Sequence, residues 1–255
     1  MAKRAEKKVV AVARRARSSL PRDLVKLLVS ANHILFHQRI VDAFGHVSVR
    51  HADKPDRFLL ARSMAPILVT PADILEFDLD GRAVDSTASV YLERFIHSEI
   101  YRLRPDVQAV IHSHSQAVIP FGVVQGTPLR PIFHMSAFLG EGCPIFEIRN
   151  TAGNGSDLLI RSSELGQALA KDLGAGPAIL MRGHGATIVA DSLQRAVFRA
   201  VYLQMNAELQ ARAMQFGAVN YLTPEEVRSA MNSVEGQLGR AWDMWRMMAE
   251  GEIGS

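Results

Sequence analysis

The chain contains a single cysteine and no long uninterrupted apolar run in its 255 residues. A disulfide needs two thiols, so the lone Cys143 excludes an internal disulfide framework. A membrane-spanning helix needs about 20 consecutive apolar residues, and a secretory leader needs a shorter apolar stretch near its start. Neither pattern occurs, and we expect a cytoplasmic protein that neither crosses a membrane nor carries an export signal.

The chain also has no strong excess of either charge sign. Its formal net charge is +3, and much of the positive excess lies in residues 1–20. We interpret this segment as a basic, flexible, solvated arm, followed by one folded domain over residues 21–255. No aromatic side chains are interleaved with the basic residues of the arm, so nucleic acid is not an expected partner.

Apolar spacing predicts both helices and strands. Helical patterns cover residues 21–37, 90–103, 164–173, 192–216 and a segment that begins at Thr223. Strands are predicted at 45–50, 57–61, 107–111 and 177–181, and the first two are expected to form a hairpin. Residues 70–73 are expected to cap a short helix that ends before Glu76, and residues 77–82 to hold an Asp-Gly turn between short strands. No repeat or linker separates these elements. The expected fold is a single α/β domain with a mixed, largely antiparallel central sheet flanked by helices.

Histidines follow two of the predicted strands. His112 and His114 come directly after residues 107–111, and side chains two residues apart on an extended chain point to the same face. His184 follows residues 177–181 and offers a third imidazole. Three protein ligands with an open coordination position are typical of a catalytic metal site. Imidazole suits Zn²⁺, Mn²⁺ or Co²⁺, and the ligand set alone does not choose between them.

Four elements in this order resemble the class II aldolase/adducin family: Gly45-His-Val-Ser-Val-Arg50, Glu93, His112-Ser-His114 and Arg182-Gly-His184-Gly. The resemblance covers about residues 24–215. It implies a three-layer αβα fold, a divalent metal bound by His112, His114 and His184, and Glu93 as an acid/base that can also bind the metal. It further implies a homo-oligomer acting on a small molecule, with the active site near a subunit boundary.

Departures from the sugar-phosphate aldolases of that family narrow the implied activity. Tyr91-Leu92 stands where those aldolases carry two small hydroxyl residues that help hold phosphate, and Gly45-His46 replaces their Gly-Asn. These features, with Phe133-His134, resemble the decarboxylase branch, which acts on hydroxylated aromatic or pyridine (di)carboxylates. The implied activity is that of a metal-dependent carbon-carbon lyase that passes through a metal-stabilised, enolate-like intermediate.

Other residues are candidates for the same site. His46 and His134 could deliver a proton or orient a carboxylate, and Arg50 and Arg62 could each grip a substrate carboxylate through two hydrogen bonds. For each of the four, an ordinary packing or ion-pairing role remains the alternative.

Two other functions remain open at this point. One is an aldolase or dehydratase acting on an unphosphorylated, sugar-like substrate. The other is a non-enzymatic, adducin-like interaction module, against which the intact set of three histidines and Glu93 argues. The apolar faces of the last helices, with Trp242 and Trp245, could pack within one subunit or between subunits.

Overall fold

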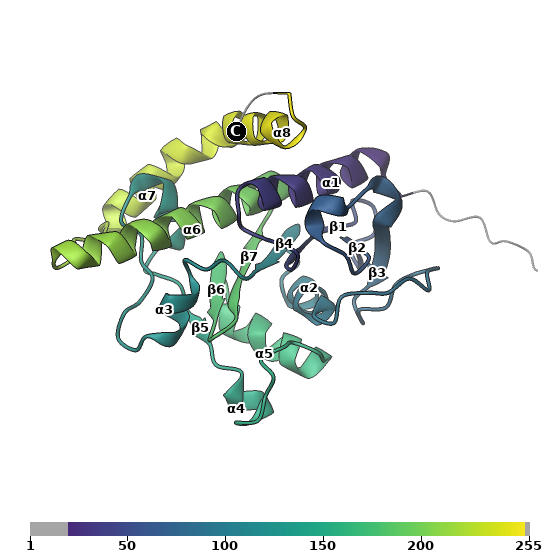
Figure 1. The fold of residues 1–255 in the computed structure, drawn as a ribbon, viewed down its shortest axis with the longest axis horizontal. Coiled ribbons are helices and arrows are strands. Elements are labelled where there is room, and N and C mark those ends of the chain that lie inside the picture. The colour runs from purple at the N-terminus through teal and green to yellow at the C-terminus, as the bar shows by residue number, and fades with distance from the viewer. Residues whose placement is uncertain (1–19, 253–255) are drawn as a thin grey trace, which may run out of the picture.

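A mixed sheet runs through the centre of the computed structural model, which describes residues 20–252 (Figure 1). The described residues form seven strands in the order β3-β2-β1-β4-β7-β6-β5. Only the β5–β6 pair is parallel, and the other neighbours are antiparallel. The strands are β1 (His46–Arg50), β2 (Arg57–Ala61), β3 (Ile74–Asp78), β4 (Ala109–Ser113), β5 (Ile145–Phe146), β6 (Ala178–Met181) and β7 (Gly185–Ala190).

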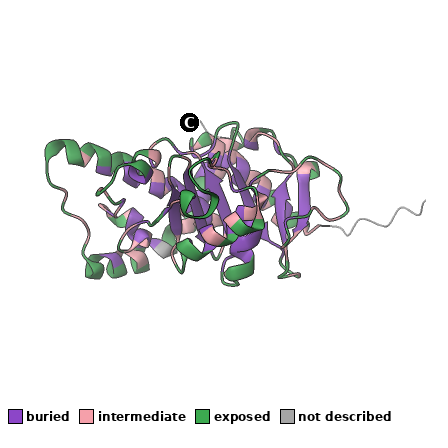
Figure 2. Ribbon diagram, turned by 90° about the horizontal axis from the view of Figure 1, so that it is seen from below, coloured by how far each residue is buried: buried purple, intermediate pink, exposed green. Residues whose placement is uncertain are grey.

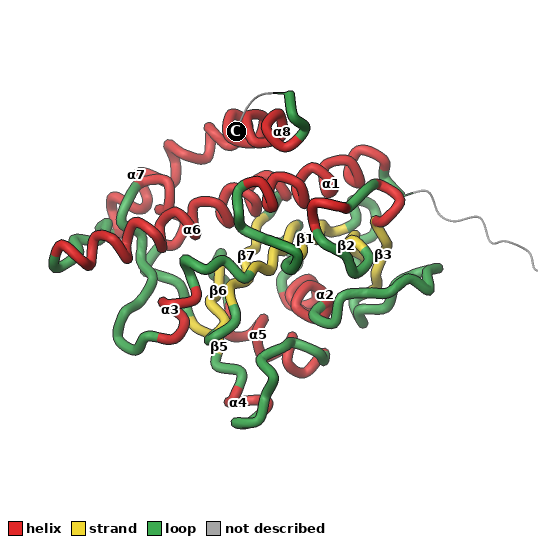
Figure 3. Tube along the Cα trace, in the orientation of Figure 1, coloured by secondary structure: helices red, strands yellow, loops and turns green. Residues whose placement is uncertain are grey.

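Helices cover both faces of the sheet (Figures 1 and 3). One face packs against α1 (Arg22–His37) and α6 (Leu193–Phe216), and α8 (Leu238–Ala249) lies on these two helices (Figure 1). The other face packs against α2 (Arg94–Leu103) and α5 (Ser163–Leu173). Strand residues alternate between the two cores, since Leu59 joins the first and Phe58 and Leu60 join the second. The strands are therefore almost wholly buried (Figure 2), and the predicted three-layer fold is confirmed.

Shorter helices occupy the connections between these elements. They are α3 (Ile119–Val123), α4 (Arg149–Ala152), α7 (Pro224–Val234) and the 3₁₀ turns η1 (Pro66–Leu68), η2 (Pro71–Asp73), η3 (His134–Leu139) and η4 (Glu235–Gln237). The predicted short helix is present as η2, in which the Thr70 and Asp73 side chains form a capping box. It ends at Asp73, before the predicted end, because Ile74 and Leu75 already pair with β2 as the start of β3. The predicted hairpin is also confirmed, because β1 and β2 pair antiparallel.

Two boundaries and one central strand differ from the prediction. Helix α2 begins at Arg94 rather than at residue 90, because the preceding segment is tied to the loop after β2: the Ser63 amide donates to Ser89 O and the Tyr91 hydroxyl donates to Met64 O. Strand β4 begins at Ala109 and includes His112. Strand β7 was not predicted as an element of its own; its small first residues, Gly185-Ala186, carry a weak strand signal.

The C-terminal tryptophans pack within the subunit. Trp242 and Trp245 are buried, and the Trp245 ring lies 6.2 Å from Tyr202 and 6.5 Å from Phe198 on α6. Among residues 20–252, no helix combines the length and apolarity needed to cross a membrane. The predicted basic arm lies outside the described residues, apart from Leu20.

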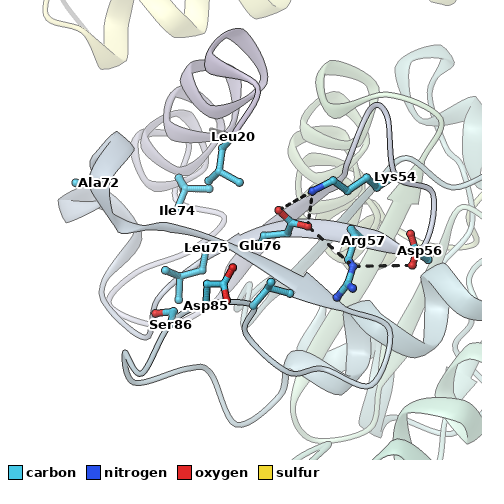
Figure 4. Close-up of a pocket in the computed structure, with 11 residues that line it drawn as sticks. Leu20, Lys54, Asp56, Arg57, Ala72, Ile74, Leu75, Glu76, Asp85 and Ser86 are labelled. Atoms are coloured by element: carbon cyan, nitrogen blue, oxygen red, sulfur yellow. Dashed lines mark hydrogen bonds and ion pairs between the residues drawn. The ribbon is translucent and has the colours of Figure 1, made fainter. Parts of the chain in front are cut away.

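The edge strand β3 borders a hollow of about 390 Å³ that is separate from the predicted site (Figure 4). Glu76 on β3 is buried there and pairs with Lys54 at 3.0 Å and with Arg57 at 3.9 Å. None of the predicted metal ligands lines this hollow. The ion pairs at this edge therefore join β3 to β2 and to the loop before β2, and no histidine among the described residues lines this hollow.

Candidate metal centre

The central strands bring the predicted ligands together. His112 lies on β4, opposite Thr187 on β7, and His184 lies in the tight turn between β6 and β7. Glu93 directly precedes α2, which packs against one face of the sheet. The four residues Glu93, His112, His114 and His184 each offer one ligand atom, and these atoms lie within 4.8 Å of one another.

Hydrogen bonds orient two of the imidazoles toward a common point. His112 Nδ1 lies 3.2 Å from Ala186 O, and His184 Nδ1 lies 2.9 Å from Leu158 O. A carbonyl oxygen only accepts, so each Nδ1 carries the hydrogen and each Nε2 presents a lone pair. Burial is the main cause that lowers the pKa of His114 to about 4, which keeps that ring neutral near pH 7.

The converging nitrogens fit a divalent cation. His114 Nε2 lies 3.1 Å from His112 Nε2 and 3.0 Å from His184 Nε2. Lone pairs that face each other at this distance repel unless a proton or a cation lies between them. Two nitrogens bound at about 2.1 Å to a tetrahedral ion would lie about 3.4 Å apart, close to the observed spacing. The donor set and its geometry therefore match a three-histidine metal site.

Glu93 is held by one oxygen and faces the histidines with the other. Its Oε1 accepts the Ile160 amide hydrogen at 2.9 Å, and its Oε2 lies 3.4 Å from His112 Nε2 and 3.5 Å from His184 Nε2. Burial raises the pKa of Glu93, but the His112 and His184 rings beside Oε2 outweigh burial and hold the pKa below its ordinary value. The carboxylate is ionised at neutral pH, ready to bind a metal or to accept a proton.

A buried hydrogen-bonded chain leads away from the centre through His46. The His46 ring lies 5.1 Å from the His112 ring, and His46 Nδ1 lies 2.6 Å from His97 Nε2. The chain continues from His97 Nδ1 to Ser48 Oγ at 2.6 Å and from Ser48 Oγ to the Tyr101 hydroxyl at 2.8 Å. Burial is the main cause that lowers the pKa of His46, and it lowers the pKa of His97 to about 3.

His46 therefore lies beside the cluster of Glu93 and the three histidines, and the sequence analysis assigned no role in the site to His97, Ser48 or Tyr101. The signal for His97 was available, because it lies four residues after Glu93. Ser48 lies two residues after His46 on β1 and so shares its face of the sheet.

Arg50 is engaged elsewhere in the structure. Its guanidinium donates to Val107 O at 2.9 Å, Tyr101 O at 2.9 Å, Arg104 O at 3.0 Å and Pro55 O at 2.5 Å. The side chain is buried, and these four carbonyls occupy the donors that a substrate carboxylate would need. The structural role of Arg50 is thus the one that its contacts support.

Arg62 and His134 also lie apart from the four ligands. Arg62 Nε donates to Asp73 Oδ1 at 2.7 Å, which ties the loop after β2 to η2. His134 is exposed at the start of η3, where it lines a small hollow together with Arg195 and Met231. Neither residue forms a hydrogen bond, ion pair or ring contact with Glu93 or the three histidines in the described structure.

Comparison with known proteins assigns the family. The family model described as the class II aldolase and adducin N-terminal domain matches residues 26–211. The chain therefore belongs to the class II aldolase/adducin family, and the resemblance read from its motifs is confirmed.

Several curated relatives are decarboxylases, in agreement with the decarboxylase-like branch. The decarboxylase tropJ of Talaromyces stipitatus is 36% identical over 245 residues, covering 87% of this chain and 92% of that protein. The 3,4-dihydroxyphthalate decarboxylase of Arthrobacter keyseri is 26% identical over 230 residues, covering 83% and 88%. Human beta-adducin is 24% identical over 189 residues, which cover 69% of this chain and 25% of the adducin.

Solved structures support the same fold. An L-fuculose 1-phosphate aldolase superposes with a TM-score of 0.74 at 20% identity, covering 86% of this chain and all of that one. An aldolase II superfamily protein from Pseudomonas syringae superposes with a TM-score of 0.76 at 21% identity, covering 92% and 96%. With the decarboxylases and aldolases among its relatives, the chain is supported as a lyase.

Proposed function

We propose that the protein is a divalent-metal-dependent carboxy-lyase that removes carbon dioxide from a hydroxylated aromatic or pyridine (di)carboxylate. The observation that carries this proposal is the convergence of three imidazole nitrogens and the Glu93 carboxylate within 4.8 Å. The similarity to tropJ and to the dihydroxyphthalate decarboxylase supports the choice of reaction.

The metal, held by His112, His114 and His184, would supply a Lewis acid for the oxygens of a hydroxy acid. The ionised Glu93 then has a defined task, which is to accept the proton of the substrate hydroxyl. When the carbon-carbon bond to the carboxylate breaks, its electron pair passes to the ring carbon. This requires that Glu93 first return the proton to the ring carbon that bears the carboxylate, so that the pair restores the aromatic ring and leaves the negative charge on the product oxygen as carbon dioxide departs. That oxygen then takes a proton from water.

The residues before Glu93 support an unphosphorylated substrate. The Tyr91 hydroxyl donates to Met64 O at 2.6 Å, and the Tyr91 ring lies 4.6 Å from the His46 ring. Tyr91 takes the place of one of the small hydroxyl residues of the sugar-phosphate aldolases, and its own hydroxyl already bonds to the backbone. Leu92 offers no hydrogen bond to a phosphate at all.

The direct test is an incubation of metal-loaded protein with hydroxyphthalates, hydroxypyridine dicarboxylates and sugar aldehydes. We expect carbon dioxide from at least one of the aromatic acids and no aldehyde product. Aldehyde release without carbon dioxide would overturn the decarboxylase proposal and favour an aldolase acting on an unphosphorylated sugar.

A matched pair of histidine variants tests the metal centre itself. His112→Ala should lose bound metal and turnover, whereas His134→Ala, which changes an exposed histidine outside the cluster, should keep its metal. Metal content is measured by emission spectrometry after gel filtration. If His112→Ala keeps both its metal and its turnover, the three-histidine centre is not the catalytic site and the proposed mechanism fails. If the wild type itself binds no metal and turns over no compound, an adducin-like interaction module becomes the better account.

We also propose that the protein is a cytoplasmic homo-oligomer. Its native metal ion would be Zn²⁺, Mn²⁺ or Co²⁺, which imidazole ligands suit. The exposed apolar side chains Val123, Val124 and Ile145 support a subunit contact near the β5 edge of the sheet. Analytical ultracentrifugation tests the oligomer, since a single species at the 28.1 kDa of one chain would refute it.

A further inference from the structure

Two large apolar side chains are exposed directly beside residues of the metal centre. The Phe44 residue is 66% exposed and comes two positions before His46, and Leu92 is 55% exposed and directly precedes Glu93. Single exposed apolar residues are common on protein surfaces and need no explanation. What sets Phe44 apart is its position, because its ring centroid lies 6.4 Å from that of the metal ligand His114, with the planes inclined by 34°.

The loop that carries Phe44 is firmly seated. The Phe44 amide donates to Asp42 Oδ1 at 2.8 Å, and the Asp42 amide donates to Phe44 O at 3.2 Å. The next residue, Gly45, has a φ of +93°, and a Cβ there would lie 2.6 Å from Val41 Cγ1 and 3.1 Å from His112 O. The loop therefore presses against β4 at the metal ligand, and Phe44 is presented to solvent by a built turn.

Space for a ligand adjoins the same loop. A cavity of about 650 Å³ is lined by His114 and by residues of the 36–42 segment, including Asp42 of the Phe44 turn. Cavities of this size accommodate small organic ligands. A planar ring whose oxygens reach the metal centre would thus pass close to Phe44, which offers apolar area and an aromatic face but no hydrogen-bonding group.

We infer that Phe44 is a specificity-determining residue that packs against the aromatic ring of the substrate. This inference rests on the proposed function and deepens it, because it accounts for the preference for a flat aromatic acid over a sugar. Aromatic rings prefer offset or tilted arrangements with centroids 4.5–7 Å apart, and a ring beside both Phe44 and His114 can satisfy this preference. Leu92 would add apolar surface next to Glu93.

The test compares Phe44→Ala with Phe44→Tyr, Phe44→Leu and the control Phe216→Ala. The control removes another exposed phenylalanine, 91% exposed at the far end of α6. With the aromatic acid that the wild type decarboxylates, Phe44→Ala should raise KM about 10-fold and change kcat by less than about 3-fold, because ring contact stabilises ground state and transition state alike. Phe44→Tyr should restore KM, Phe44→Leu should restore it only in part, and Phe216→Ala should leave it unchanged.

A binding experiment separates failure of this inference from failure of the proposed function. Metal-loaded protein is titrated calorimetrically with 3,4-dihydroxybenzoate and, for comparison, with the non-aromatic hydroxy acid malate. We expect Phe44→Ala to weaken binding of the aromatic acid about 10-fold and to leave malate unaffected, whether or not any compound is decarboxylated.

Three outcomes would overturn the assignment of Phe44. The first is that Phe44→Ala binds the aromatic acid as tightly as the wild type, and the second is that Phe44→Leu restores KM fully. The third is that Phe44→Ala changes the oligomeric state on gel filtration, which would make Phe44 a subunit contact. Loss of carbon dioxide release from every compound, with the Phe44-dependent binding intact, would instead refute the proposed function alone.

Discussion

A single methyl group at Gly185 should disturb the metal centre. This glycine joins His184 to β7 and lies against the end of β4. A Cβ built on it would lie 2.0 Å from Ser113 O and 3.1 Å from His114 Cα, whereas real Cβ atoms essentially never approach a heavy atom closer than 3.0 Å. The atom in the way belongs to the backbone and cannot rotate aside. Gly185→Ala therefore forces β4 and β7 apart by at least about 1 Å.

The expected magnitude follows from what those strands carry. Inserting one extra carbon into a well-packed region costs about 1–3 kcal/mol, so the free energy of unfolding should fall by that amount. His184 directly precedes Gly185, His112 lies on β4, and His114 directly follows β4. The same shift therefore moves His184 away from the other two histidines. Since outer contacts that orient metal ligands are worth about 10–100-fold in affinity, we expect a loss of that size in Gly185→Ala.

Two measurements check this prediction. Urea unfolding of the metal-free protein reports the stability, and competition with a chelator reports the metal affinity. Gly155→Ala serves as the control, because a Cβ at Gly155 meets no atom within 4 Å. The reasoning is refuted if Gly185→Ala binds metal as tightly as the wild type, or if Gly155→Ala weakens binding equally.

Three further predictions concern stability. Arg50→Lys should lower the free energy of unfolding in urea by about 2–4 kcal/mol, because a lysine cannot donate to all four carbonyls. Arg62→Ala, which breaks one ion pair at the surface, should lower it by about 1 kcal/mol or less. Equal losses in the two variants would contradict this prediction. Gly166→Ala should destabilise the α2–α5 contact by about 1–3 kcal/mol, because its Cβ would lie 2.4 Å from Phe95 O; unchanged thermal unfolding would refute it. Burial lowers the pKa of His97 to about 3, whereas the pKa of a histidine in the unfolded chain is about 6.5. Between these two values the unfolded chain binds a proton that the folded protein does not, so the free energy of unfolding should fall by about 1.4 kcal/mol for each pH unit from 6.5 down to 3. Acid titration of His97→Gln should show a smaller fall.

The layers of the fold could be predicted because periodicity reports burial. Leu59 and its neighbours alternate between two cores, and the antiparallel pairing of β1 with β2 follows from a short connection. Boundaries were harder, since they depend on tertiary contacts. Nothing local to Tyr91 reveals that its hydroxyl will bond to Met64 O and keep the segment before Glu93 out of the helix.

The metal ligands were accessible from the sequence, whereas the groups that orient them were not. His112 and His114 share a face by strand geometry, His184 follows a second predicted strand, and the family resemblance gave Glu93 its expected role. Their partners include Ala186 O and the backbone of residues 158–160, and every residue type offers these same groups. Arg50 was a wrong candidate for the opposite reason. The sequence shows that an arginine is present, but not whether backbone carbonyls or a substrate will accept its hydrogen bonds.

One short backbone segment, residues 158–160, holds both the His184 imidazole and the Glu93 carboxylate. Leu158 O accepts from His184 Nδ1, and two residues later the Ile160 amide donates to Glu93 Oε1. Leu158 adopts a φ of +70°, which is unfavourable for leucine, and its amide is held by Ser156 Oγ at 3.0 Å. A displacement of this segment would turn the imidazole and release the carboxylate together. The geometry of the centre therefore depends on a loop that contributes none of its four ligand side chains, and metal affinity and proton transfer should respond jointly to changes in that loop.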